Sequence, residues 1–90
     1  MDIAYDPDKD RLNKAKHGVS LACAENIDWD LALESLDDRR DYGEDRYVAL
    51  APIGNRLFYV VFVDRGMKRR IISLRKANAR EVKYYVEAQN

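Results

Sequence analysis

The 90-residue sequence contains only one cysteine, one histidine and two prolines, and it has no net charge. Because Cys23 is alone, an intrachain disulfide is excluded, and one cysteine with one histidine cannot build a zinc site of the usual type. So little cysteine is typical of a protein from a reducing compartment. Since 16 basic residues balance 16 acidic ones, the overall charge does not attract nucleic acid, and any basic site must be local.

Long hydrophobic runs are also missing. No stretch approaches the roughly 20 apolar residues of a membrane span, and residues 1–6 have neither the basic nor the apolar region of a signal peptide. We therefore expect a cytoplasmic protein without membrane association. With no repeat or linker visible, residues 1–90 are expected to form a single domain.

The N-terminal part of the sequence predicts a short strand and two short helices. Residues 3–5 alternate apolar and polar side chains, as a strand does. A helix is expected over residues 8–17, with Leu12, Ala15 and Lys16 on roughly one side and Gly18 just past its end. Ser20 can cap a second short helix.

The rest of the sequence predicts a sheet and a C-terminal helix. Residues 31–36 fit either a helical turn or a short strand, and we favour the strand. After a charged loop over residues 37–45, three further strands are expected over residues 46–53, 56–64 and 70–75. The second of these three is apolar on both faces, which is typical of a central strand. Asn78 and Glu81 form a capping box for the last helix, whose Tyr84 and Tyr85 are expected to pack. The predicted fold is therefore α+β, with a mainly antiparallel three- to four-stranded sheet.

A basic segment lies near the C-terminus, and it includes Arg69, Arg70, Arg75, Lys76 and Arg80. Strict alternation along a strand places Arg70 on one face and Ser73 with Arg75 on the other. Two guanidinium groups and a small hydroxyl can clamp a phosphate. A solvated face with ordinary salt bridges explains the same pattern, so charge alone leaves both interpretations open.

Two further motifs combine charged and proton-transferring groups. His17, next to Lys16, can exchange a proton near neutral pH, or it can simply be a cation that suits the end of a helix. Glu44 and Arg46 are two residues apart, so they share a face of an extended chain. They either reach one site together or form an exposed pair of little energetic value.

The order of these motifs resembles that of the BrnT family. Lys-His-Gly stands at residues 16–18, Gly-Glu-x-Arg at 43–46 and Arg-Ile-Ile-Ser-x-Arg-Lys-Ala at 70–77. Each motif alone is weak, but the ordered set is specific, and the resemblance extends from about residue 6 to residue 85.

This resemblance implies a toxin subunit of a type II toxin–antitoxin pair with a RelE-like ribonuclease fold. Such a toxin cleaves RNA and so arrests translation and growth. A BrnA-like antitoxin is expected to neutralise it in a complex with two copies of each chain. The complex is expected to repress its own operon, contacting DNA only through the antitoxin.

For this activity we assign roles to individual residues. Arg70 and Arg75 are expected to hold the phosphate, supported by Arg46, and either His17 or Glu44 to act as acid or base. The residues expected to bind RNA are Lys16, Ser73, Lys76 and Arg80. No metal or other cofactor is expected. Two rival functions remain, namely a related module that only binds its partner and a metal-dependent nuclease.

Overall fold

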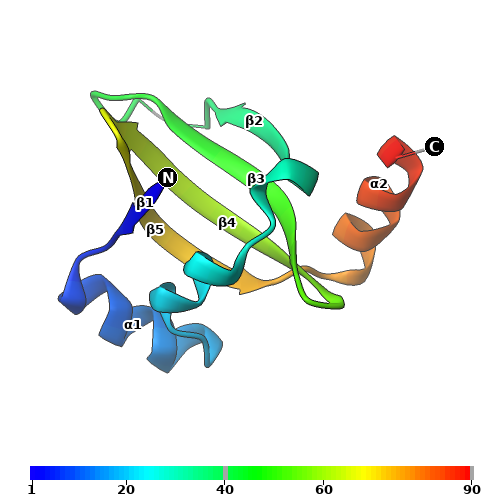
Figure 1. Ribbon diagram of the computed structural model, residues 1–90, viewed down its shortest axis with the longest axis horizontal. Helices are drawn as coiled ribbons and strands as arrows, with labels where there is room; N and C mark the ends of the chain where they lie inside the picture. Colours follow the sequence, from blue (N-terminus) through cyan, green and yellow to red (C-terminus); the bar gives the residue numbers. More distant parts are fainter. Residues whose placement is uncertain (40, 90) are drawn as a thin grey trace.

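The computed structural model describes residues 1–39 and 41–89. Its strands are β1 (Asp2–Ala4), β2 (Leu33–Asp37), β3 (Arg46–Ile53), β4 (Arg56–Arg65) and β5 (Lys68–Lys76). Its helices are α1 (Pro7–His17) and α2 (Ala79–Gln89), with 3-10 segments η1 (Leu21–Asn26) and η2 (Trp29–Leu31) (Figure 1). The sheet order is β1-β5-β4-β3-β2, in which β1 is parallel to β5 and every other neighbouring pair is antiparallel.

The predicted fold class is confirmed, with two changes of detail. Strands β2 to β5 form the expected antiparallel meander, and β4 is central. The short N-terminal strand joins this sheet as a fifth, parallel strand. The second helix is a 3-10 segment rather than an α-helix, although Ser20 caps it as expected by accepting a bond from the Ala22 amide at 3.1 Å. No helix among the described residues is long and apolar enough to cross a membrane.

One face of the sheet, here called the helical face, is covered by η1 and η2. In Figure 1 these cyan segments run across the sheet, and the core lies beneath them. Its fully buried large side chains are Leu21, Val60, Phe62, Ile71 and Leu74. Trp29 packs edge-to-face on Phe62, with ring centroids 5.3 Å apart. Trp29 is therefore packed against the core.

Helix α1 docks on the sheet through polar rather than apolar side chains. Leu12 is 70% exposed, while its neighbour Asn13 is only 5% exposed. The side-chain amide of Asn13 donates to the carbonyls of Leu74 and Val19, both at 2.8 Å. Its oxygen accepts a hydrogen bond from the Leu74 N–H at 3.2 Å. Asn13 therefore replaces a missing strand partner at this edge of β5.

Helix α2 stands apart at the far end of the sheet (Figure 1). The predicted capping box is confirmed, because the Asn78 side chain accepts a bond from the Glu81 amide at 2.8 Å and the Glu81 side chain accepts one from the Asn78 amide at 2.9 Å. None of its described residues is buried, and Tyr84 is 61% exposed, so the expectation that Tyr84 packs is wrong. Tyr85 attaches the helix to the body through a 2.6 Å bond from its hydroxyl to the Leu31 carbonyl.

Candidate functional site

A bulge in β5 decides which basic side chains lie together. Val61 of β4 pairs with Ser73, but the next residue, Phe62, pairs with Ile71, so Ile72 is an extra residue. An extra residue reverses the alternation beyond it. The prediction that Arg70 lies on the face opposite Arg75 is therefore wrong, and the two arginines share one face.

That face, here called the open face, is the one opposite the helical face. Three neighbouring cross-strand rows of this face carry the residues of the candidate site. Near the β2–β3 loop, the first row joins the pairs Asp37–Arg46 and Val63–Arg70. The middle row consists of Ser35, Val48, Val61 and Ser73, and the third of Leu33, Leu50, Tyr59 and Arg75. Neighbouring rows on one face are two residues apart along a strand, which is roughly 7 Å. Arg70 in the first row and Arg75 in the third are therefore about 13 Å apart, measured between their Cα atoms.

Arg75 is held rigidly on the open face by Tyr59 and by helix α2. Its guanidinium lies 4.2 Å above the Tyr59 ring, and Nη1 and Nη2 each donate to a Glu81 carboxylate oxygen at 2.8 Å. These bonds raise the pKa of Arg75 and lower that of Glu81, so both groups stay ionised at neutral pH. Nη1 also donates to the Lys76 carbonyl at 3.3 Å.

Part of the Arg75 guanidinium is left for a ligand. A guanidinium has five N–H donors, which form two fork-shaped edges. Glu81 occupies the edge formed by Nη1 and Nη2, and among the described residues none accepts a bond from Nε. The edge formed by Nε and Nη2 can therefore bind a phosphate while Glu81 keeps the side chain in place.

His17 lies beside the same face, at the junction of α1 and β5. It lines a hollow of about 220 Å³ together with Lys16, Ile72 and Ser73. Burial lowers the pKa of His17, and the nearby positive charges of Lys16 and Arg75 lower it further. The lowered pKa favours the neutral imidazole, which is the form that can accept a proton.

Arg46 and Arg70 lie at the other end of the open face. Arg70 approaches the Asp6 carboxylate at 3.9 Å, which is a weak contact, and its side chain is 34% exposed. The Arg46 guanidinium lies 4.0 Å above the Tyr42 ring. The open face thus carries positive charge at both ends, with the hydroxyl of Ser73 between them.

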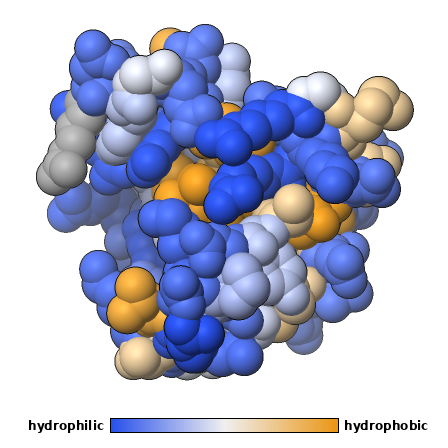
Figure 2. All heavy atoms as spheres, turned by 90° about the vertical axis from the view of Figure 1, so that its left-hand side faces the viewer, coloured by the Kyte–Doolittle hydropathy of each residue, from blue (hydrophilic) through white to orange (hydrophobic). Residues whose placement is uncertain are grey.

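Glu44 does not join this group. Its carboxylate receives two bonds from Arg65, at 3.0 and 3.2 Å, in the loop between β2 and β3. Arg46 stacks on Tyr42, so among the described residues Glu44 is paired with Arg65 and not with Arg46. Seen from the end of the molecule that carries this loop, the surface is mainly hydrophilic, with apolar side chains visible between the charged ones (Figure 2).

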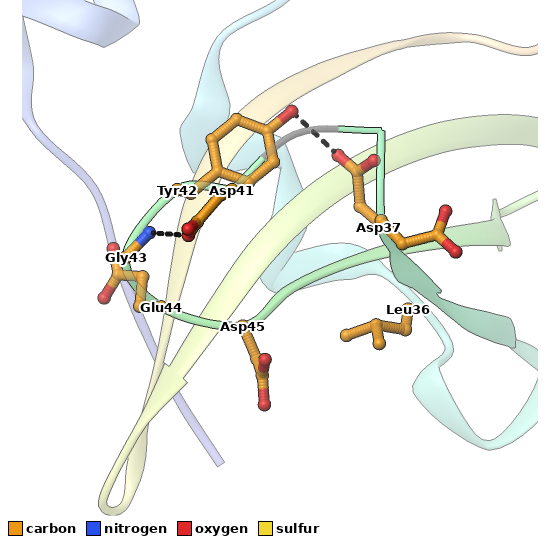
Figure 3. A pocket seen from close by; sticks show the side chains of 8 residues that line it. Leu36, Asp37, Asp41, Tyr42, Gly43, Glu44 and Asp45 are labelled. Atoms are coloured by element: carbon orange, nitrogen blue, oxygen red, sulfur yellow. Dashed lines mark hydrogen bonds between the residues drawn. The ribbon is translucent and has the colours of Figure 1, made fainter.

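The same loop borders a hollow of about 510 Å³. Its lining includes the carboxylates of Asp37, Asp38, Asp41, Glu44 and Asp45 (Figure 3). A pair of bonds from Arg39 lowers the pKa of the Asp37 carboxyl to about 2, so it stays ionised and its stabilising effect is lost only as the pH falls towards 2. So much negative charge repels RNA phosphate, and size alone does not make this hollow the RNA site. Among the described residues, no three His, Cys, Asp or Glu side chains are grouped to hold a metal ion.

Lys76 is placed away from the open face, and Arg80 belongs to helix α2 rather than to the sheet. Lys76 pairs with Phe58 and so points to the helical side of the sheet, at its exposed end. Arg80 is exposed in the first turn of α2. Both lie close to Arg75 in the chain, but neither shares its row.

Comparison with known proteins is consistent with this arrangement. A model of the BrnT toxin family, described as the ribonuclease toxin of type II toxin–antitoxin systems, matches residues 5–81. The chain belongs to the BrnT family. It also resembles the crystal structure of the Brucella abortus ribonuclease toxin BrnT, with 25% sequence identity and a TM-score of 0.62, over 87% of this chain and 97% of that one. No curated protein sequence matches it.

For this BrnT-family chain, the motifs identified in the sequence omit two residues that complete the Arg75 environment. Tyr59 was not identified because its position below Arg75 depends on the β4–β5 register. Glu81 was recognised only as a helix cap, although it also binds Arg75. The only signal in the sequence was a negative charge three residues after the capping Asn78 and six residues after Arg75. That spacing does not show whether Glu81 caps the helix, binds Arg75 or does both.

Proposed function

We propose that this chain is the toxin of a type II toxin–antitoxin pair and that it cleaves RNA at the open face without a metal ion. The observation that supports this most directly is the bulge at Ile72. It turns Arg70, Ser73 and Arg75 to one accessible face, with His17 at the edge. β-Bulges are common next to active sites, where they redirect side chains in this way.

The proposed reaction uses the RNA's own 2′-hydroxyl as nucleophile. The 2′-oxygen loses its proton and attacks the adjacent phosphorus, the bond to the 5′-oxygen breaks, and that oxygen takes up a proton. The products are a 2′,3′-cyclic phosphate and a 5′-hydroxyl. Arg75, through its free Nε edge, stabilises the charge that develops on the phosphate, and Arg70 holds the neighbouring part of the backbone.

His17 accepts the 2′-proton in this proposal. The wild-type rate should rise with pH through a midpoint below about 6.5, because the imidazole must be neutral and its pKa is lowered. In a His17→Gln variant this acidic limb should disappear. Rates of RNA cleavage between pH 4.5 and 8 measure both profiles. A Glu44→Gln variant is the control and should keep the wild-type limb; loss of the limb in that variant instead would transfer the role to Glu44.

The charge pairs of the open face favour one rival function. Arg75 is paired with Glu81, and Arg70 lies near Asp6, so both expected phosphate ligands have acidic neighbours. A family member that binds only its protein partner would have the same neighbours. Cleavage by the purified chain separates the two functions.

The decisive experiment incubates the purified chain with single-stranded RNA in excess EDTA. We expect undiminished cleavage, with cyclic-phosphate and 5′-hydroxyl ends identified by mass spectrometry. Cleavage lost in EDTA and restored by a divalent cation would point to a metal-dependent nuclease. Intact RNA under all conditions would favour the binding module.

Membership of the BrnT family also implies an antitoxin partner. We propose that it is a BrnA-like protein, that the complex contains two copies of each chain and that its DNA contacts come from the antitoxin and repress the operon. The same RNA assay, repeated with the co-purified product of the adjacent gene, tests the inhibition. The mass of that complex tests the stoichiometry.

A further inference from the structure

A second hollow lies on the open face, next to Arg75, and has no role in the proposed cleavage. Its volume is about 260 Å³, and its side-chain lining includes Leu33, Ser35, Val48, Leu50, Tyr59 and Tyr84. This volume is below the roughly 300–1,000 Å³ of pockets that hold drug-sized ligands. The hollow therefore suits one small ring system.

Aromatic and polar groups surround this hollow. Tyr59 forms part of it, and Tyr84 contributes a second aromatic ring from helix α2. β2 is the edge strand in the order of the described strands, so the backbone groups on its outer side have no strand partner. Together with the Ser35 hydroxyl, they offer donors and acceptors to a flat ligand.

Positive charge borders the hollow on one side. The Arg75 guanidinium lies 4.2 Å above the same Tyr59 ring that lines the hollow. Arg39 is close enough to act electrostatically on both Tyr59 and Arg75. An aromatic hollow beside fixed guanidinium groups matches a nucleotide, whose flat base is joined to a phosphate.

We infer that this hollow binds one unstacked nucleobase of single-stranded RNA while the adjacent phosphate lies on Arg75. The inference rests on the proposed function and extends it to substrate choice. This role explains why Tyr84 is exposed, because an aromatic ring that stacks on a base must be accessible in the free protein. A base bound next to the scissile phosphate also sets where the chain cuts.

The test measures binding of a fluorescent 2′-O-methyl RNA oligonucleotide, which cannot be cleaved because the 2′-hydroxyl is blocked. Tyr84→Ala should weaken binding about tenfold, within the range for loss of one stacked base. Tyr84→Phe should bind like wild type because its ring remains. Val86→Ala is the matched control, since Val86 is exposed on the same helix but lines a different hollow, and it should bind within about twofold.

Cleavage of unmodified RNA gives the second readout. Tyr84→Ala should raise KM more than it lowers kcat, and it should relax the preference for the base beside the cut. Equal binding by wild type and Tyr84→Ala overturns the inference, as does a wild-type chain that does not bind the oligonucleotide. A defect of Tyr84→Ala confined to the antitoxin complex also overturns it and makes the hollow a protein contact. If only the proposed function fails, wild type leaves RNA intact while oligonucleotide binding still depends on Tyr84.

Discussion

Replacing Arg75 with alanine should slow RNA cleavage by about 10²–10³-fold, the usual effect of removing one donor that stabilises developing charge. Arg75 is the arginine whose geometry the fold controls most tightly. Tyr59 supports it from below, and Glu81 holds one edge at 2.8 Å while the other edge stays available. Such a preorganised donor loses little entropy when the transition state forms.

The measurement is the single-turnover cleavage rate of a defined RNA under saturating enzyme. Because Arg75→Ala also leaves Glu81 without its partner, an Arg75→Lys variant should accompany it. Lysine keeps the charge but not the fork-shaped edge, and should recover only part of the rate. Arg56→Ala is the matched control, since it removes the same charge from an exposed position at the start of β4. A wild-type rate in Arg75→Ala, or an equal loss in Arg56→Ala, would refute the assignment.

Replacing Asn13 with leucine should lower the free energy of unfolding by roughly 3 kcal/mol or more, since every buried polar group left without a partner costs about 1–3 kcal/mol. The Asn13 amide satisfies both backbone groups of Leu74 and the carbonyl of Val19. Leucine has a similar volume but no polar atom, so all three groups would lose their partner. A domain of this size has only about 5–15 kcal/mol in total.

Urea unfolding followed by circular dichroism measures the change. The adjacent substitution Leu12→Asn is the control. It is the same exchange in reverse, on a side chain that is 70% exposed, and should change stability by less than about 0.5 kcal/mol. A hydrophobic pattern interpreted without the structure predicts the opposite order, with Leu12 the critical residue. Similar urea midpoints for Asn13→Leu and wild type would show that α1 does not depend on this amide.

Local signals account for the parts of the fold that the sequence predicted well. Gly18 ends α1 with a φ of 71°, and Gly54 forms the β3–β4 turn with a φ of 58°, both in the left-handed region that favours glycine. The bonds of the Asn78–Glu81 capping box join residues three positions apart. Each of these interactions involves residues close together in the sequence, so the ends of the corresponding helices and strands can be predicted from the sequence.

The residue types of the site were also predictable, but their arrangement was not. Arg70, Ser73, Arg75, Lys16 and His17 all came from motifs, and the structure places them around one face. Glu44, in the β2–β3 loop, came from a motif as well, yet its carboxylate accepts bonds from Arg65 at the end of β4. Spacing along an extended chain shows which side chains share a strand face, but it says nothing about the path of a loop.

The sequence by itself therefore determined the α+β class, the order of the elements, the turns, the helix caps and the residues that chemistry would require. The tertiary structure decided which face each residue occupies. The bulge at Ile72 is set by how β4 and β5 align along their whole length, and it places Arg70 and Arg75 on one face where alternation separates them. The inward position of Asn13 depends on a backbone partner 61 residues away. Both features are pairings between distant parts of the chain, and no local pattern encodes them.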